Sequence, residues 1–199
     1  MTIPTAAETA IAHYLSKGLT KDVSVALPAC LYYESKLSPD SQGVQKTETP
    51  GILNPGGAYG IASWNGPRQQ ALLTFATKKD LDPALLGTQL DFVLTECANS
   101  YSIVWKAIQN PAINYTDMIT IFVTSYEIPA NIPAEIATSL AYAKSWYPEI
   151  VEPAPAPTTP TPVVATPPIV APPVPVAAGE TNLAIINALA EAIIKYANS

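Results

Sequence analysis

The stretch VSVALPACLYYESKL, residues 23–37, decides the fold of this chain. It is apolar nearly all round the helical axis, which is typical of a helix buried at the centre of an α-helical domain. Thr20 can cap its start and Ser38-Pro39 follows its end, so we expect a helix over residues 21–36. Pro28 inside it predicts a kink or a slow start of the helix.

Glu34 lies on an apolar face of this helix, one turn after Cys30 and Leu31 and two turns after Leu27. Burial there disfavours the charged carboxylate and raises its pKa. A general acid that works near neutral pH needs such a carboxyl group. The helix pattern alone also fits a glutamate at a helix end that reaches solvent.

Similar signals indicate further helices. Thr5 and Glu8 form a capping-box pattern, and Pro67 suits the first position of a helix. Residues 37–66 have the glycine and proline content of one long loop, with at most a small β-ribbon within 40–62. We therefore expect a mainly α-helical domain of six or seven helices. They are expected at about 6–16, 21–36, from 67 onward, 83–98, 101–109, 116–126 and 133–146.

The composition changes near Trp146, which divides the chain into a domain (1–147), a linker (148–178) and a terminal helix (179–199). Between Pro148 and Pro175 lie 11 of the 21 prolines. Proline fixes φ and has no amide proton, so the linker should be an extended spacer about 85 Å long.

The expected terminal helix carries a narrow apolar stripe, and so short a helix is marginal alone in water. It should bury this stripe in a protein partner or in copies of itself. A membrane surface, or the domain itself, would be the alternative cover.

The composition also excludes functions. The net charge of −6 leaves no basic stripe for nucleic acid. The chain has one histidine, His13, and two cysteines, Cys30 and Cys97. These are too few ligands for a zinc site, and no Cys–His peptidase is expected. No cofactor is predicted. The two cysteines are either buried free thiols or a single bridge. The N-terminus lacks the pattern of a secretory signal, and no apolar run is long enough to span a membrane.

The sequence GAYGIASWNGPR, residues 57–68, combines glycines with two aromatic residues and one arginine. Glycine lets a backbone approach a ligand closely, and the rings of Tyr59 and Trp64 offer faces on which sugars can stack. Trp64 also fits the role of a core or hinge residue.

Four motifs, in this order, resemble the phage tail lysozyme family of the lysozyme-like superfamily, over roughly residues 5–147. They are Glu34-Ser35 with Ser38-Pro39; Tyr59-Gly60-Ile61-Ala62-Ser63-Trp64 with Gly66 and Arg68; Gln89-Leu90-Asp91-Phe92-Val93 with Glu96; and Phe122, Tyr126-Glu127 and Pro129.

The resemblance implies a lysozyme-like helical fold and an antimicrobial enzyme that cleaves peptidoglycan between N-acetylmuramic acid and N-acetylglucosamine. It implies that Glu34 is the catalytic acid. The substrate-binding residues that it implies are Tyr59, Ser63, Trp64, Arg68 and Tyr126. Family members usually carry glutamine at the position of Ser63, and the shorter serine puts one substrate hydrogen bond in doubt.

A hydrolase needs a second carboxylate as base or nucleophile, and the candidates are Glu48, Asp40 and Glu127. Glu127 fits an ion pair with Arg68 equally well. If no carboxylate is within reach, the 6-hydroxyl of the sugar can attack, which is lytic transglycosylase chemistry.

Two further questions stay open in the sequence. The domain could be a non-catalytic structural or glycan-binding module, since membership of a family does not guarantee function. The linker and terminal helix favour a virion tail location, with a tail protein or a second copy as partner. The alternative is a free endolysin that stays in the host cytoplasm until lysis.

Overall fold

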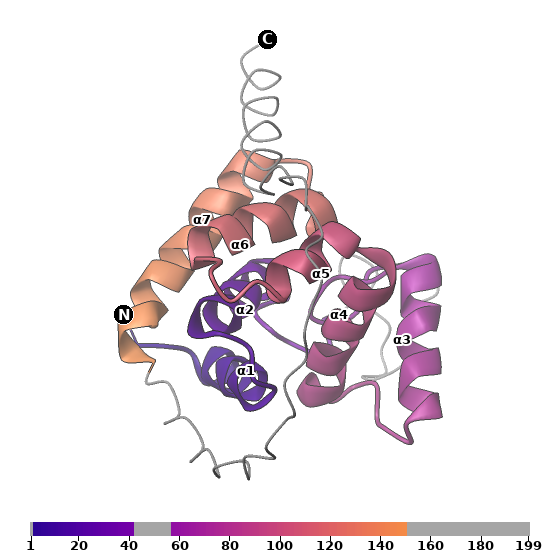
Figure 1. The fold of residues 1–199 in the computed structure, drawn as a ribbon. Coiled ribbons are helices and arrows are strands. Elements are labelled where there is room, and N and C mark those ends of the chain that lie inside the picture. The colour runs from indigo at the N-terminus through magenta and orange to yellow at the C-terminus, as the bar shows by residue number, and fades with distance from the viewer. Residues whose placement is uncertain (1, 42–56, 151–199) are drawn as a thin grey trace, which may run out of the picture. The chain divides into compact units, whose positions relative to one another are not determined.

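The computed structural model describes residues 2–41 and 57–150, all within the unit Met1–Pro155. Figure 1 shows these residues as a set of helices around α2 (Lys21–Ser35). The predicted linker beyond residue 150, the terminal helix, Glu48 and most of the long loop lie outside the described residues.

Helix α2 is the central helix, as its sequence predicts. Thr20 caps it by accepting a hydrogen bond from the amide of Val23 at 3.3 Å. Every residue from Val23 to Leu31 is buried, and Pro28 lies inside the helix without ending it. Helices α1 (Thr5–Ser16), α6 (Tyr115–Phe122) and α7 (Ile132–Trp146) pack around it.

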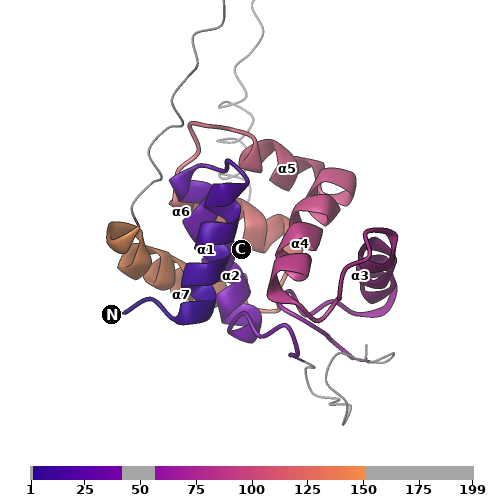
Figure 2. The ribbon, with the colours of Figure 1, turned by 90° about the horizontal axis from the view of Figure 1, so that it is seen from below.

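The other helices form a second group beside α2. Figures 1 and 2 show α4 (Leu86–Ser100) next to this centre and α3 (Gly66–Lys78) on the outer side of α4. Helix α5 (Ser102–Ile108) follows α4 after a single residue and packs on α6. The mainly α-helical prediction is therefore confirmed for the described domain.

Three local details differ from the sequence-based expectation. Helix α1 begins after Pro4, with no side-chain cap, so the capping box predicted at Thr5 and Glu8 is wrong. The expected helix 116–126 is α6 followed by a π-helix, η1 (Val123–Glu127). Helix α7 continues into a 3-10 turn, η2 (Tyr147–Glu149), and the hydroxyl of Tyr147 donates to Asp22 at 2.9 Å.

The expected β-ribbon is reduced, within the described part of residues 40–62, to one isolated bridge. Tyr59 and Trp64 pair in antiparallel fashion, with backbone hydrogen bonds of 2.8 and 2.9 Å. The chain between them turns sharply, because Ser63 donates its amide to the Gly60 carbonyl at 3.2 Å.

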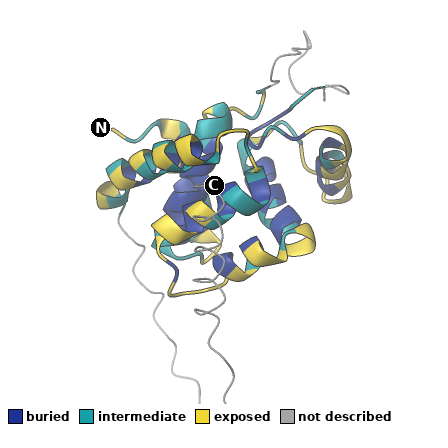
Figure 3. Cartoon of the chain, turned by 90° about the horizontal axis from the view of Figure 1, so that it is seen from above, coloured by how far each residue is buried: buried dark blue, intermediate teal, exposed yellow. Residues whose placement is uncertain are grey.

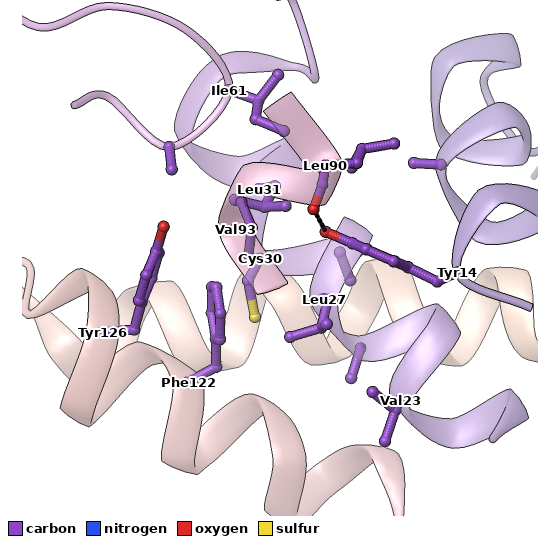
Figure 4. Close-up of a cluster of buried hydrophobic side chains, with 14 of the residues drawn as sticks. Tyr14, Val23, Leu27, Cys30, Leu31, Ile61, Leu90, Val93, Phe122 and Tyr126 are labelled. Carbon is purple, nitrogen blue, oxygen red and sulfur yellow. Dashed lines mark hydrogen bonds between the residues drawn. The ribbon is translucent and has the colours of Figure 1, made fainter. Parts of the chain in front are cut away.

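The core runs along α2 and between the surrounding helices. Figure 3 shows the buried faces turned inward, and Figure 4 shows side chains of α1, α2, α4 and α6 meeting there. The Tyr14 hydroxyl donates to the Leu90 carbonyl at 3.4 Å within this core (Figure 4). Cys30 and Cys97 are buried free thiols, the first of the two predicted alternatives.

None of the helices in the described ranges has the length and apolar character needed to cross a bilayer.

Candidate active site

Glu34 lies in the last turn of α2, where the buried helix reaches the surface. Glu34 is of intermediate burial, so part of the residue is accessible to solvent. Burial raises the pKa of Glu34, and the nearby Glu135 carboxyl raises it further, while a hydrogen bond with Ser63 opposes the rise. Glu34 thus combines access to solvent with a preference for its protonated form, which are the two properties that a general acid needs.

Ser35, the next residue, fixes the loop beside Glu34. Its hydroxyl lies 3.2 Å from the Leu31 carbonyl of its own helix and 2.9 Å from the carbonyl of Ile61. The second contact joins the end of α2 to the loop that carries Ser63. The Glu-Ser pair therefore supplies a candidate acid and also the attachment of the loop beside it.

Gln89 holds the same loop from α4. Its side-chain oxygen accepts from the Ile61 amide at 3.0 Å, and its amide nitrogen donates to the carbonyls of Pro39 and Pro83 at 2.9 and 2.8 Å. Gly60 has a φ of 75°, and a Cβ added there would lie 2.7 Å from the Gln89 oxygen. Glycine is therefore required at position 60 for both conformation and space.

A second group of polar residues surrounds Glu96, and we call it the Glu96 cluster: Glu96, Trp64, Arg68 and Tyr126. The Arg68 guanidinium binds the carboxylate through two hydrogen bonds, of 2.7 and 2.9 Å. The Trp64 indole donates to it at 2.9 Å and the Tyr126 hydroxyl at 2.6 Å. Four donor groups thus satisfy one buried carboxylate.

This arrangement corrects one prediction. Arg68 pairs with Glu96 of α4, so the alternative of an ion pair between Arg68 and Glu127 is wrong. Glu96 lies within α4, whereas Glu127 is the last residue of the helical stretch Tyr115–Glu127, so the partner of Arg68 depends on how the helices pack.

The two aromatic residues of the Glu96 cluster are inaccessible to a polymer in this conformation. Trp64 is 0% exposed, with its ring against Phe92, and Tyr126 is 2% exposed, stacked on Phe122. Tyr59 is also 0% exposed, and burial raises the pKa of its hydroxyl to about 12. Their burial gives these residues a structural role, while Ser63 and Arg68 keep exposed surface.

Glu34 belongs to a second acidic group, which we call the carboxyl cluster: Glu34, Glu127 and Glu135. Glu127 ends η1, and Glu135 lies in the first turn of α7 and is 0% exposed. Burial raises the pKa of Glu127 well above its usual range, and hydrogen bonding to Glu135 raises it further. Glu135 is the residue that the sequence analysis missed, because nothing in its local sequence shows which way it faces.

The other two candidates for a second carboxylate lie elsewhere. Asp40 is exposed, and its charge acts on Tyr59 rather than on Glu34. Glu48 lies outside the described residues. Of the three candidates, Glu127 is the one that the described structure brings to Glu34.

A shallow pocket lies beside the Glu96 cluster, at the junction of α4 and α5. Tyr101 lies in its wall, edge-on to Tyr126 and below the Arg68 guanidinium. The pocket is lined by Ser100, Tyr101, Ser102, Ile103, Val104 and Ser125. Tyr101 is a partly exposed aromatic residue near the site, which the sequence motifs do not mark.

Neither Asp91 with its ion pairs nor the carboxyl cluster has the ligand set of a metal site in the described part of the chain. Asp91 forms ion pairs with His13 and Lys17, each at 2.8 Å, on the outer face of α1 and α4.

Comparison with known proteins agrees with the motifs. A family model described as phage tail lysozyme matches residues 5–150. The match confirms the resemblance drawn from the four motifs and extends it to the end of η2. A search of curated proteins returns no match.

Proposed function

Because the chain belongs to the phage tail lysozyme family, we propose that it cleaves the glycan strands of peptidoglycan with Glu34 as the general acid. The family assigns the chain to lysozyme-like, peptidoglycan-degrading enzymes of phages. The bond proposed is the one between N-acetylmuramic acid and N-acetylglucosamine. The observation that carries the assignment of the acid is the raised pKa of a partly exposed Glu34.

In this mechanism the protonated Glu34 donates its proton to the glycosidic oxygen as positive charge develops on the sugar. Ser63 then stabilises the carboxylate that remains, because a hydrogen bond from its hydroxyl favours the charged form. Ser35 and Gln89 hold the loop that carries Ser63, so both act by position.

One observation favours lytic transglycosylase chemistry as a second candidate. The carboxyl oxygens of Glu127 are buried, and burial raises the pKa of this group well above the usual range, so its neutral form is favoured. A neutral, enclosed carboxyl is a poor base or nucleophile. If Glu127 does not act as base or nucleophile, the 6-hydroxyl of the muramyl residue can attack instead.

Digestion of purified peptidoglycan, followed by mass spectrometry of the fragments, tests both points. Reducing muramyl ends identify a hydrolase and anhydro-muramyl ends a transglycosylase. Glu34→Gln should lower the rate by about 100- to 10,000-fold, the usual contribution of a general acid. A Glu34→Gln protein that digests the wall at the wild-type rate would show that Glu34 is not the acid and would favour a non-catalytic tail module.

We also propose that the enzyme is attached to the virion tail through residues 179–199, with a tail protein or a second copy as partner. A long spacer raises the local concentration of a tethered enzyme at the wall, an advantage that a free endolysin in the host cytoplasm would not gain. Binding to purified virions should be lost when the chain is ended at Ile150. Equal binding of the full and shortened chains would contradict the attachment.

A further inference from the structure

The carboxyl cluster brings together three helix ends of different polarity. Glu34 is in the last turn of α2, and Glu127 is the last residue of η1, which continues α6. Glu135 is in the first turn of α7. The C-terminal end of a helix disfavours negative charge, and the N-terminal end favours it. The helix ends therefore favour a neutral Glu34, a neutral Glu127 and an ionised Glu135.

The contacts of the cluster agree with this distribution of charge. The four carboxyl oxygens of Glu127 and Glu135 are buried, and no nitrogen or hydroxyl donor in the described part of the chain bonds to them. Glu135 lies within hydrogen-bonding reach of both Glu34 and Glu127. Two carboxyl groups attract each other at that range only when one of them carries a proton.

We propose that Glu135 is a buried anion that accepts hydrogen bonds from protonated Glu34 and protonated Glu127, and so acts as the positioning residue of the catalytic acid. This inference rests on the proposed function, because it assigns a role relative to Glu34. One negative charge shared among three carboxyl groups explains how they remain together without a paired cation. It also keeps a proton on Glu34 before substrate arrives.

The charged and titratable groups around the cluster support this assignment. Arg68, the cation that acts on Glu127, is paired bidentately with Glu96 and only weakly favours a charged Glu127. The thiol of Cys30 is held neutral, since burial raises its pKa. The groups that face the cluster are Cys30 from α2, Ser63 from the loop, Arg68 from α3 and Ser139 from α7.

Two matched substitutions test the proposal through the pH profile of kcat/KM on peptidoglycan. Glu135→Gln removes the anion and offers Glu34 an amide donor that stabilises its carboxylate. The alkaline limb of the profile should then move to lower pH by about one unit. Glu127→Gln makes the same chemical change at the neutral partner, and its amide still donates to Glu135. Its alkaline limb should stay within about 0.3 units of wild type.

Two further variants complete this experiment. Glu135→Asp keeps the charge, so its alkaline limb should stay closer to that of wild type than the limb of Glu135→Gln. Glu8→Gln, an exposed change in α1, should leave both rate and profile unchanged. The full chain is used throughout, and thermal unfolding of each variant verifies that it is folded. The proposal is overturned if both glutamine variants shift the limb equally, or if Glu135→Gln leaves it in place.

Infrared spectroscopy at neutral pH provides a test that needs no activity. Wild type should show the absorption of protonated carboxyl groups, and Glu127→Gln should lose the part that comes from Glu127 and keep the part that comes from Glu34. Glu135→Gln should keep a protonated-carboxyl absorption at a shifted frequency. Loss of this absorption in Glu135→Gln and not in Glu127→Gln would reverse the assignment. Because no turnover is measured, the result stands apart from the proposed function, which fails only if Glu34→Gln remains active.

Discussion

The Glu96 cluster and the carboxyl cluster treat the same chemical group in opposite ways. Glu96 is 7% exposed, and its carboxylate has an arginine, an indole and a phenol as donors. The carboxyl oxygens of Glu127 and Glu135 are also buried, yet they have no such donors. A satisfied buried carboxylate stabilises a fold, whereas an unsatisfied group shifts its pKa and can move protons. Under the proposed function, the Glu96 cluster therefore stabilises the domain and the carboxyl cluster supports the chemistry.

The largest expected effect comes from breaking the satisfied cluster. Glu96→Ala leaves the Arg68 charge and the Trp64 and Tyr126 donors without an acceptor in a buried site. The loss should be about 3–5 kcal/mol of unfolding free energy, measured by chemical denaturation. Exposed Glu8→Ala serves as the control, with a change of less than about 0.5 kcal/mol. A loss below about 1 kcal/mol for Glu96→Ala would contradict the structural role of this cluster.

The loop between the two clusters should be nearly as sensitive, because Trp64 belongs to one cluster and Ser63 contacts the other. Gly60→Ala forces a Cβ against Gln89 at a positive φ and should cost about 2–3 kcal/mol, with reduced peptidoglycan cleavage. Gly66 also has a positive φ, but nothing lies within 4 Å of an added Cβ. Gly66→Ala is therefore the matched control and should cost about 1 kcal/mol. Equal costs at the two glycines would show that the contact with Gln89 is unimportant.

A smaller effect should come from replacing Glu127 of the carboxyl cluster by a residue that cannot ionise. The pKa of Glu127 is raised in the folded state by burial and Glu135, so the folded protein holds this proton more tightly than the unfolded chain. The stabilisation is present below the ordinary glutamate pKa and is lost as the pH rises toward the folded value. Glu127→Gln cannot lose this proton and should gain about 1–2 kcal/mol relative to wild type at pH 8. Thermal unfolding from pH 4 to 8 measures it, and parallel curves for the two proteins would refute the prediction.

The smallest expected effect concerns Ser63. Its hydrogen bond lowers the pKa of Glu34 against the upward effects of burial and Glu135. Ser63→Ala removes that bond, so the alkaline limb of the pH–rate profile should move up by about 0.3–0.5 units. Ser63→Thr, which keeps a hydroxyl, should move it less. A downward shift in the alanine variant would mean that Ser63 does not bond to the charged form of Glu34.

The part of this account that sequence could predict is the part controlled by local pattern. Local pattern predicts the helix at residues 21–36 from its apolar residues 23–31 and the cap at Thr20. It also predicts the start of α3 from the proline at position 67. The place of Glu34 at the end of that apolar stretch makes it a candidate acid, although the pattern alone also fits a helix-end glutamate. The resemblance to the family, drawn from the four motifs, adds the assignment of Glu34 as the acid and marks the loop at residues 59–64.

The part that sequence could not predict depends on how the helices face one another. The choice of Glu96 rather than Glu127 as the partner of Arg68 follows from tertiary packing. The change from α6 to the π-helix η1 also follows from tertiary packing; η1 ends at Glu127, and Ile128 after it has a positive φ of 49°. Glu135 resembles an ordinary glutamate of a first helical turn until α7 packs against α2.

The central claim is that Glu34 keeps its proton because of its surroundings, and the most direct test is a carbon-13 NMR titration of its side-chain carboxyl. The signal is identified by its absence in Glu34→Gln. The account predicts a midpoint above that of the exposed Glu8 in the same protein. A midpoint at or below that of Glu8 would contradict the account and remove the physical basis for Glu34 as the acid.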